Sequence, residues 1–287
     1  MKEKVIESYL FSCIEKEKLF ENINGKDERD AAEKYLQNAI NDAEFALNFL
    51  EPYLKTNMKI LEVGGGLHLL SSYLHFQGYD ITSIEPGDFT LFVNKLRKNI
   101  LKVLNKTTIY TTTLENFQTK HKYDFIFSIN VLEHTNSILE HINCQRKLLS
   151  DYNSKALFRA PNYNIPFEPH FYKFFIPSFP TFTFEKLYKK NLVKEFGEER
   201  YREIYQSLNF DCKYTYINKN FSITIKNPLS EIFQRLKNDD LFSQRILKNN
   251  KIKAIYKLIN QLKLYNFLKI FPKRFYPYLI FVINRDS

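Results

Sequence analysis

The stretch MKILEVGGGLHLL, residues 58–70, decides the fold. An apolar run over 58–63 ends in three consecutive glycines, Gly64, Gly65 and Gly66, although the chain of 287 residues has only seven glycines. Consecutive glycines let a backbone turn sharply and approach a ligand where side chains would block it. Apolar residues then recur at helical spacing from Leu67 onward. The stretch predicts a strand, a glycine turn and a helix start, the geometry of a nucleotide-type crevice in an α/β sheet.

Short apolar strands alternate with helices over the next hundred residues. Strands are expected at 59–63, 80–84, 107–110, 123–129 and 155–159, and helices after the first glycine turn and over 88–104 and 136–150. Gly78 lies where a glycine would end the first of these helices. Alternation at this pitch predicts a doubly wound, mostly parallel α/β sheet. The β-like run over 278–283 is a further strand candidate.

The segments on either side of this core have different patterns. Residues 1–24 read as an amphipathic helix, and Asp30 with Glu33 resembles a capping box that opens a long helix ending near Pro52. Five of the ten prolines fall between Pro161 and Pro180, among many aromatic residues, which predicts an ordered aromatic loop. Beyond it, we expect a helical segment over 184–208, strands at 212–217 and 221–225, and helices over 229–247 and 252–270.

The positive charge is concentrated at the C-terminal end. The formal net charge is +10, and residues 228–287, the basic tail, hold twelve Lys and Arg against four Asp and Glu, which leaves +2 for the first 227 residues. Three interpretations stay open: a solvated face, a patch for a membrane surface or an anionic substrate, and a nucleic-acid patch. Lysines mixed with Leu, Phe and Tyr over 262–283 favour peripheral membrane contact over nucleic acid.

Cysteine usage and hydropathy bear on localisation. Cys13, Cys144 and Cys212 are far apart, without metal-ligand spacing, which predicts free thiols in a reducing compartment. The first residues are charged and lack the apolar core of a signal peptide. No uncharged stretch reaches the roughly 18–20 residues of a spanning helix. We therefore expect a cytoplasmic protein.

Four motifs lie at the carboxyl ends of the expected parallel strands, in order. They are Glu62-x-Gly64-x-Gly66, Glu85-Pro86, Leu114-Glu115, and the run 128–134 that contains Asn130, Val131 and His134. Ligands bind open α/β sheets at the carboxyl ends of the strands. An acidic residue after the second strand can accept both ribose hydroxyls, and one after the third can accept an adenine amino group.

With these motifs the sequence resembles the class I S-adenosylmethionine-dependent methyltransferases, in the branch of ubiquinone-biosynthesis-type and glycan-cluster enzymes. The resemblance covers about residues 30–165 and implies a Rossmann-like, seven-stranded, mostly parallel sheet with helices on both faces, N-terminal helices and a helical, aromatic cap insertion. It also implies S-adenosylmethionine as cofactor. A dinucleotide cofactor fits less well, because the fingerprint G-x-G-x-x-G starting at Gly64 would need glycine where Leu69 stands.

The resemblance also assigns cofactor-binding roles. The glycines would pass beneath the methionine part of the cofactor, and Glu62 would steady that loop or the amino group. Glu85 would hold the ribose, Pro86 would lie against the adenine, and Leu114 and Glu115 would bracket the base. Backbone carbonyls of Asn130 and Val131 would line the sulfonium. The family's usual third glycine is His68 here, which either reaches the cofactor or simply begins the helix.

The acceptor is predicted from the residues after the fourth and fifth strands. The Asn/Asp-Pro-Pro-Tyr/Phe motif of exocyclic-amine methyltransferases is missing from the sequence, which favours an oxygen acceptor. His134 and His170 are candidate bases, with Glu168 orienting His170. Asn162, Tyr163, Glu168 and His170 are candidate substrate contacts. Each histidine also has a purely structural interpretation: His134 as a capping or packing residue, and His170 as a hydrogen-bonded residue of a loop. No set of Asp, Glu and His has metal-ligand spacing, so we expect a metal-independent reaction.

These expectations combine into one hypothesis. The chain is expected to form a single methyltransferase domain over 1–287: N-terminal helices (1–55), a cofactor-binding core (56–160), a substrate loop and cap (161–210), and the last strands with a basic helical insertion (211–287). It would methylate an oxygen of a small molecule or of a sugar-nucleotide or glycan precursor for cell-surface polysaccharide. The alternatives are an RNA or protein methyltransferase that uses the basic tail, and a non-catalytic cofactor-binding subunit.

Overall fold

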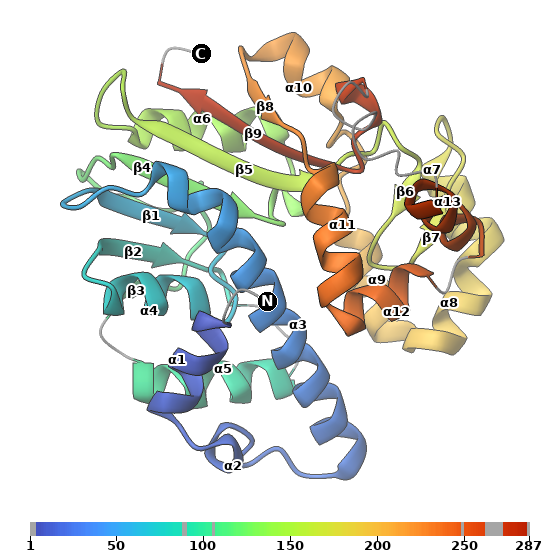
Figure 1. Ribbon diagram of the computed structural model, residues 1–287, viewed down its shortest axis with the longest axis horizontal. Helices are drawn as coiled ribbons and strands as arrows, with labels where there is room; N and C mark the ends of the chain where they lie inside the picture. Colours follow the sequence, from blue (N-terminus) through green and yellow to red (C-terminus); the bar gives the residue numbers. More distant parts are fainter. Residues whose placement is uncertain (1–3, 88–90, 105–106, 248–249, 262–271, 286–287) are drawn as a thin grey trace. The chain divides into compact units, whose positions relative to one another are not determined.

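The chain folds around one seven-stranded sheet. The computed structural model describes residues 4–87, 91–104, 107–247, 250–261 and 272–285 (Figure 1). The strand order is β3-β2-β1-β4-β5-β9-β8. The strands are β1 (Lys59–Val63), β2 (Asp80–Ile84), β3 (Thr108–Tyr110), β4 (Phe125–Ile129), β5 (Lys155–Pro161), β8 (Thr224–Lys226) and β9 (Tyr278–Asn284). β1 pairs in parallel with β2 and β4, β2 pairs in parallel with β3, and β8 is antiparallel to β9. The predicted fold class is confirmed.

The central strands are apolar on both faces, as strands of a parallel sheet covered by helices must be. Ile60 and Leu61 of β1 are fully buried, and so are Ile126 and Phe127 of β4. By contrast, the short strand β3 at the edge of the sheet has no fully buried residue. This gradient explains why the runs over 59–63 and 123–129 are the clearest strand signals in the sequence.

The chain divides into two compact units. The first contains residues 1–129, 144–156 and 284–286, and the second contains residues 130–143 and 157–283 together with the last residue. In the first unit, α3 (Lys26–Leu50) packs against α1 (Val5–Cys13), α4 (Leu69–Phe76) and α5 (Leu91–Leu104), as Figure 1 shows. Two short elements, α2 (Lys16–Leu19) and the 3₁₀ turn η1 (Glu51–Tyr53), flank α3.

Two expectations for the N-terminal helices were wrong. The helix expected over 1–24 is broken, because Ile14 takes an extended conformation that buries its side chain before α2 begins. The long helix starts at Lys26 rather than near Asp30, after Gly25 with φ of +95°. A residue without Cβ takes that conformation at little cost, so glycine geometry replaces the predicted capping box. The C-cap prediction is confirmed: Gly78 has φ of +90° and donates to the His75 carbonyl.

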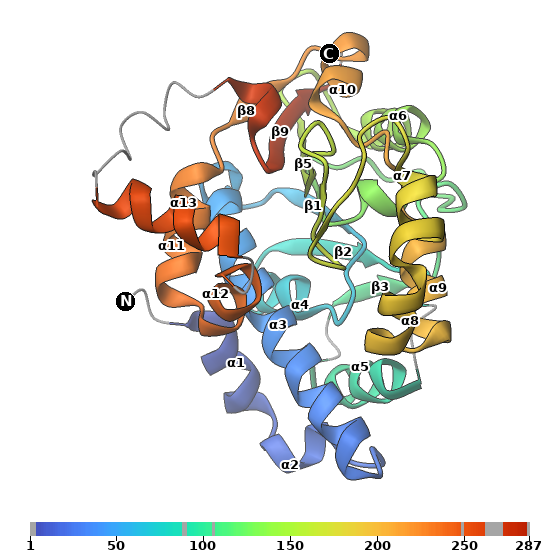
Figure 2. The same ribbon diagram turned by 90° about the vertical axis from the view of Figure 1, so that its right-hand side faces the viewer.

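The second unit contains most of the remaining helices and a small hairpin. Its elements are η2 (Leu132–His134), β6 (Phe167–Glu168) and β7 (Lys173–Phe174), α7 (Pro180–Phe182), the π-helical turn η3 (Thr183–Tyr188), α8 (Lys189–Phe196), α9 (Glu198–Ser207), α10 (Tyr214–Asn220), α11 (Leu229–Asn238), α12 (Asp240–Leu247), α13 (Asn250–Gln261) and η5 (Lys273–Phe275). α6 (Ile138–Leu148) is shared between the units. α8 packs against α9, and α12 against α11 and α13 (Figure 2).

Several boundaries in this unit differ from expectation. The segment expected as a strand over 212–217 forms α10, because the side-chain oxygens of Asn162 and Asn164 accept hydrogen bonds from Tyr214 N and Thr215 N at its first turn. The helix expected over 229–247 breaks at Asp239, whose carboxylate accepts a bond from Phe242 N and caps α12. Of the helix expected over 252–270, residues 262–271 lie outside the described residues, as does that part of the basic tail.

The aromatic loop forms a core of its own. Phe184 is fully buried, and its ring centroid lies 5.6 Å from that of Phe171, 5.7 Å from Phe210 and 6.0 Å from Phe175. Burial of several aromatic rings holds the loop and the helices after it together. Within the described residues, no helix is both long and apolar enough to span a membrane.

Asn162 connects three segments of this unit, which generates a stability prediction. Its side chain is 1% exposed; it donates to the carbonyls of Arg274 and Tyr276 and accepts from the amides of Asn164 and Tyr214. Asn162→Ala should lower the free energy of unfolding by about 2–4 kcal/mol, because buried partners lose their bonds. Urea denaturation measures this.

The neighbouring Asn164 is the matched control. Among the described residues, its side chain bonds to Thr215, near solvent. Asn164→Ala should therefore cost less than about 1 kcal/mol. An equal loss in both variants would contradict the connecting role of Asn162.

Candidate functional site

The glycine turn between β1 and α4 is fixed to the end of β2. Gly64 N and Gly65 N donate to the Ile84 carbonyl at 2.9 and 3.2 Å. A Cβ added to Gly65 would overlap Ser83 Oγ and His68 Nδ1, whereas a Cβ on Gly66 would have no described atom within 4 Å. Gly65 is therefore required by packing inside the protein, and Gly66 presents the open backbone of the turn.

Glu85 joins the turn from the end of β2. Its Oε2 accepts a hydrogen bond from Gly66 N at 2.9 Å, and its Oε1 accepts one from Gly87 N at 3.2 Å. Each carboxylate oxygen has two lone pairs, so both oxygens can still accept a bond from a ligand hydroxyl. The side chain is 8% exposed. The first two sequence motifs therefore meet at one carboxylate.

A buried chain of hydrogen bonds supports this turn. Arg97 can only donate, so His68 Nε2, 3.0 Å from its guanidinium, accepts, and the His68 proton is on Nδ1. Nδ1 lies 2.9 Å from Ser83 Oγ, which in turn donates to Glu62 Oε2 at 2.6 Å. Burial and the nearby Arg97 lower the pKa of His68 to about 3, so the ring is neutral. The chain runs from Arg97 through His68 and Ser83 to Glu62.

These hydrogen bonds hold the side chains of His68 and Glu62 in place beside the turn. Both ring nitrogens of His68 bond to protein groups, and His68 is the N-cap residue directly before α4, with φ of 57°. Burial raises the pKa of Glu62. The sequence predicted both residues as cofactor contacts, which stays a prediction, whereas Ser83 and Arg97 were missed. Neither of these lies in a motif, and the histidine in place of a third glycine was the one available signal.

The other predicted cofactor contacts lie after neighbouring strand ends. Pro86 is exposed after Glu85, Leu114 is buried, and Glu115 is exposed beyond β3. Their roles stay predictions. In the second unit, Asn130 comes after β4 with φ of 57°, and its side chain accepts a bond from Arg159 at 2.5 Å. Val131, half-buried, comes directly before η2.

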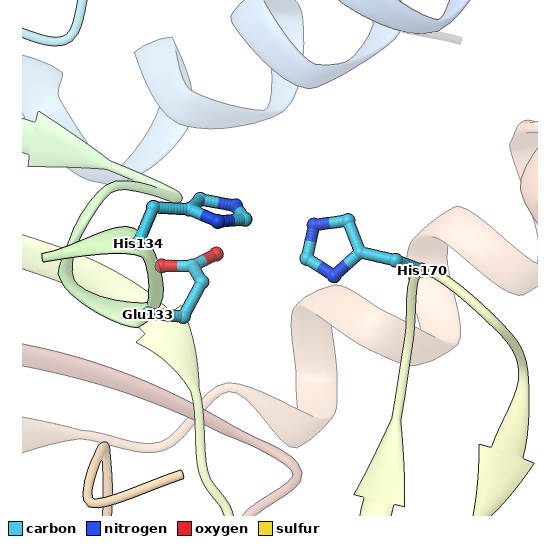
Figure 3. Close-up of side chains that lie close together, drawn as sticks. All are labelled: Glu133, His134 and His170. Carbon is cyan, nitrogen blue, oxygen red and sulfur yellow. The ribbon is translucent and has the colours of Figure 1, made fainter. Parts of the chain in front are cut away.

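A second group of polar residues gathers in the second unit. Glu133 and His134 come from η2 after β4, and His170 comes from the turn between β6 and β7 (Figure 3). One side-chain donor atom from each lies within 4.8 Å of the other two. We call these three residues the histidine–glutamate cluster. Sequence spacing predicted no such set, because His170 is brought back by the hairpin from far along the chain; metal independence stays a prediction.

Each histidine of the cluster has its Nδ1 engaged elsewhere. His170 Nδ1 lies 2.5 Å from Glu168 Oε1, and Glu168 Oε2 accepts from Phe171 N at 2.7 Å. His134 Nδ1 lies 2.9 Å from Ser207 Oγ. Ser207 donates its one proton to the Ile204 carbonyl, so it must accept from His134. Nε2 of each neutral ring is therefore the nitrogen with a lone pair to offer.

Electrostatics differ among the three members of the cluster. Burial raises the pKa of Glu133 to about 7, partly opposed by His170. Burial opposes the charge on His170 too, but the Glu168 carboxylate outweighs it and raises the pKa of His170. Desolvation and His170 lower the pKa of His134, which is neutral at pH 7. The His134 side chain still reaches solvent, which screens part of this effect.

The remaining predicted substrate contacts are buried. Tyr163 donates its hydroxyl to Glu168 Oε1 at 3.3 Å, and Asn162 bonds to four backbone groups. These contacts support the loop that holds His170, and substrate binding by the two residues stays a prediction. Glu133 and Ser207 were missed as members of this site. Glu133 was visible only as part of a motif, and nothing local indicated Ser207.

Proteins with similar sequences were found by comparison with known proteins. Two uncharacterized proteins of Mycobacterium tuberculosis (strains CDC 1551 / Oshkosh and H37Rv) are each 33% identical over 177 residues, which cover 59% of this chain. The match spans 58% of the length of these curated relatives.

Solved structures of methyltransferases are also similar. The CcbJ methyltransferase from Streptomyces caelestis is 20% identical with a TM-score of 0.36, over 44% of this chain and 51% of that chain. The plantazolicin methyltransferase BpumL, solved in complex with SAH, is 14% identical with a TM-score of 0.45, over 98% of this chain and 94% of that chain.

A family model describes more than half of the chain. The model is that of a methyltransferase domain, and it matches residues 34–212, which include the glycine turn, Glu85 and the histidine–glutamate cluster. The chain belongs to this methyltransferase-domain family.

Proposed function

We propose that this protein is an S-adenosylmethionine-dependent methyltransferase that methylates a hydroxyl oxygen of a small molecule or of a sugar or glycan precursor for cell-surface polysaccharide. Family membership supports the reaction class. The observation that carries the proposal is the Glu85 carboxylate, which bonds to Gly66 N and Gly87 N at the end of β2. Glu85 would be the anionic acceptor for the ribose hydroxyls, and its bond from Gly66 N holds it beside the open backbone of the glycine turn.

Residues of the first unit are our candidates for binding this cofactor. Glu85 would accept the ribose hydroxyls, and the amide-rich turn at Gly64–Gly66 would lie beside the methionine part. The chain through His68, Ser83 and Glu62 holds the turn in place before binding, which reduces the ordering cost. The cofactor supplies a methyl group on a positively charged sulfur, and transfer is a displacement at that carbon.

His170 in the second unit is our candidate base for an oxygen acceptor. His170 donates from Nδ1 to the Glu168 carboxylate, which leaves Nε2 to accept the proton of a hydroxyl. Glu168 is a positioning residue: it is fully buried and is itself held by Phe171 N and Tyr163. A neutral amine nitrogen is nucleophilic enough to attack without a base, whereas a hydroxyl oxygen is a weaker nucleophile that benefits from a base to take its proton. Membrane-surface or anionic-substrate contact by the basic tail stays a prediction, as does a cytoplasmic location.

Cofactor binding tests the reaction class. Glu85→Ala should weaken S-adenosylmethionine binding by about 10- to 100-fold, because charge-assisted hydrogen bonds to the carboxylate are lost. Titration calorimetry measures the dissociation constant. Asp80→Ala, at the exposed opposite end of β2, is the matched control and should bind like the unchanged protein. No binding by the unchanged protein would refute the proposal.

Gly65 provides a second test, of the packing within the turn. Gly65→Ala should abolish measurable cofactor binding, because its Cβ would overlap Ser83 and His68 and displace the turn. Gly66→Ala meets no described atom and should fold with a penalty of about 1 kcal/mol for its left-handed conformation. Thermal unfolding of both variants separates these effects. A Gly65→Ala protein with unchanged stability and affinity would be inconsistent with this packing.

The acceptor class is tested with methyl-¹³C-labelled cofactor. Incubation with nucleotide-sugar, RNA and protein fractions, followed by NMR and mass spectrometry, should place the label in the sugar fraction as a methyl ether. Label confined to RNA or protein, or carried on nitrogen, would refute the oxygen and sugar assignments while leaving the reaction class intact.

The base is tested by pH dependence. The methyl-transfer rate should rise with pH through a pKa above the ordinary histidine value, because His170 must be neutral and Glu168 raises its pKa. Glu168→Gln should move this acid limb of kcat/KM to lower pH. His170→Ala should reduce kcat roughly 10²- to 10⁴-fold, whereas His121→Ala, an exposed histidine, should have no effect. An unchanged pH profile in Glu168→Gln would exclude His170 as the base.

A further inference from the structure

We propose that the histidine–glutamate cluster binds one divalent transition-metal ion through Glu133, His134 and His170. This metal site goes beyond the proposed methyl transfer and does not require it. The three donor atoms lie within 4.8 Å of one another, and Figure 3 shows the three side chains converging on a common space. All three residues belong to the same compact unit.

The hydrogen bonds around the cluster orient both imidazoles for metal binding. Glu168 accepts from His170 Nδ1, and Ser207 accepts from His134 Nδ1. Metal-binding histidines almost always donate their second N–H to a carboxylate, carbonyl or water, which fixes the tautomer and strengthens the donor nitrogen. Here a carboxylate and a hydroxyl have that role, so in the neutral form of each ring Nε2 is the nitrogen that carries the lone pair.

Glu133 supplies an independent indication of a ligand. Its side chain is 1% exposed, and among the described residues its buried Oε2 has no hydrogen-bond partner. Burying a carboxylate oxygen without a partner is costly. Coordination of a cation by Oε2 would satisfy it, and the other two members of the cluster lie within reach of the same ion.

The donor set selects the class of metal. Two imidazoles and one carboxylate suit Zn²⁺, Co²⁺, Ni²⁺ and Fe²⁺, whereas Mg²⁺ and Ca²⁺ prefer oxygen donors only. Donor atoms at about 2.1 Å from one tetrahedral ion lie about 3.4 Å apart. Each pair of donor atoms in the cluster would therefore have to close by at most about 1.4 Å on binding the ion. Three protein ligands leave a fourth position open.

Metal occupancy would also affect the proposed reaction. An ion bound at His170 Nε2 takes up the lone pair with which His170 would accept a proton. Zn²⁺ should therefore inhibit methyl transfer, a consequence that rests on the proposed function. Metal binding itself is measured without cofactor or acceptor, so failure of one proposal is distinguishable from failure of the other.

The test is a metal titration of the full, tag-free chain after treatment with chelator. Zn²⁺ in calorimetry should bind with one ion per chain, Co²⁺ should develop the visible absorption of a tetrahedral site, and Mg²⁺ should produce neither signal. Glu133→Gln and His134→Gln should each weaken Zn²⁺ binding roughly 100-fold, and Ser207→Ala about tenfold through loss of orientation.

Controls separate loss of the site from loss of the fold. Circular dichroism and thermal unfolding should be unchanged in Glu133→Gln, which keeps the shape of the side chain, and His121→Ala should bind Zn²⁺ like the unchanged protein. Absence of stoichiometric Zn²⁺ binding, or equal binding by the unchanged protein and both ligand variants, would overturn the metal site. Activation of methyl transfer by Zn²⁺ would leave the metal site intact and overturn His170 as the base.

Discussion

Parallel pairing of β1 with β2 is the constraint on which the cofactor site depends. The register aligns Val63 with Ile84, so the residues after both strands emerge at the same edge of the sheet. Gly64 and Gly65 can then donate to the Ile84 carbonyl, and Glu85 can accept from Gly66. A slip by one residue would turn Glu62 and Ser83 to the opposite faces and separate the turn from its carboxylate.

The buried chain beside this turn shows how a histidine is accommodated at the position where the resemblance predicts a third glycine. A histidine in a left-handed conformation is less favourable than glycine, and a buried imidazole needs partners for both nitrogens. Arg97 and Ser83 supply them, and Glu62 accepts the last proton of the chain. The position that a third glycine would leave open is thus filled by a ring that connects β1, β2 and α5. Gly65 has to be glycine because that ring lies against it.

How far the sequence predicted the structure depends on how local each interaction is. The core strands were predicted within one or two residues, because their buried apolar runs are continuous in the sequence. The segment of α10 was predicted as a strand. Its first turn is capped by Asn162 and Asn164, about fifty residues earlier, and nothing local in the sequence indicates these caps. The candidate site divides in the same way: glycine, Glu85 and the histidines lie in recognisable segments. Ser83, Arg97, Glu133 and Ser207 act through contacts that only the folded chain creates.

The orientation of the two cluster histidines connects the two proposals chemically. A neutral ring whose Nδ1 proton is held by an acceptor presents an unprotonated Nε2, and that lone pair binds a proton or a metal ion with the same geometry. Glu168 strengthens His170 for either purpose because its negative charge stabilises positive charge on the ring. Glu133 distinguishes a histidine that serves as a base from one that binds a metal ion. A base needs no second anion beside it, whereas an ion bound by two imidazoles gains a third ligand from the buried Oε2. Within the part of the chain that the structure describes, the Oε2 of Glu133 has no hydrogen-bond partner, and this favours metal binding as the reason for the cluster's composition.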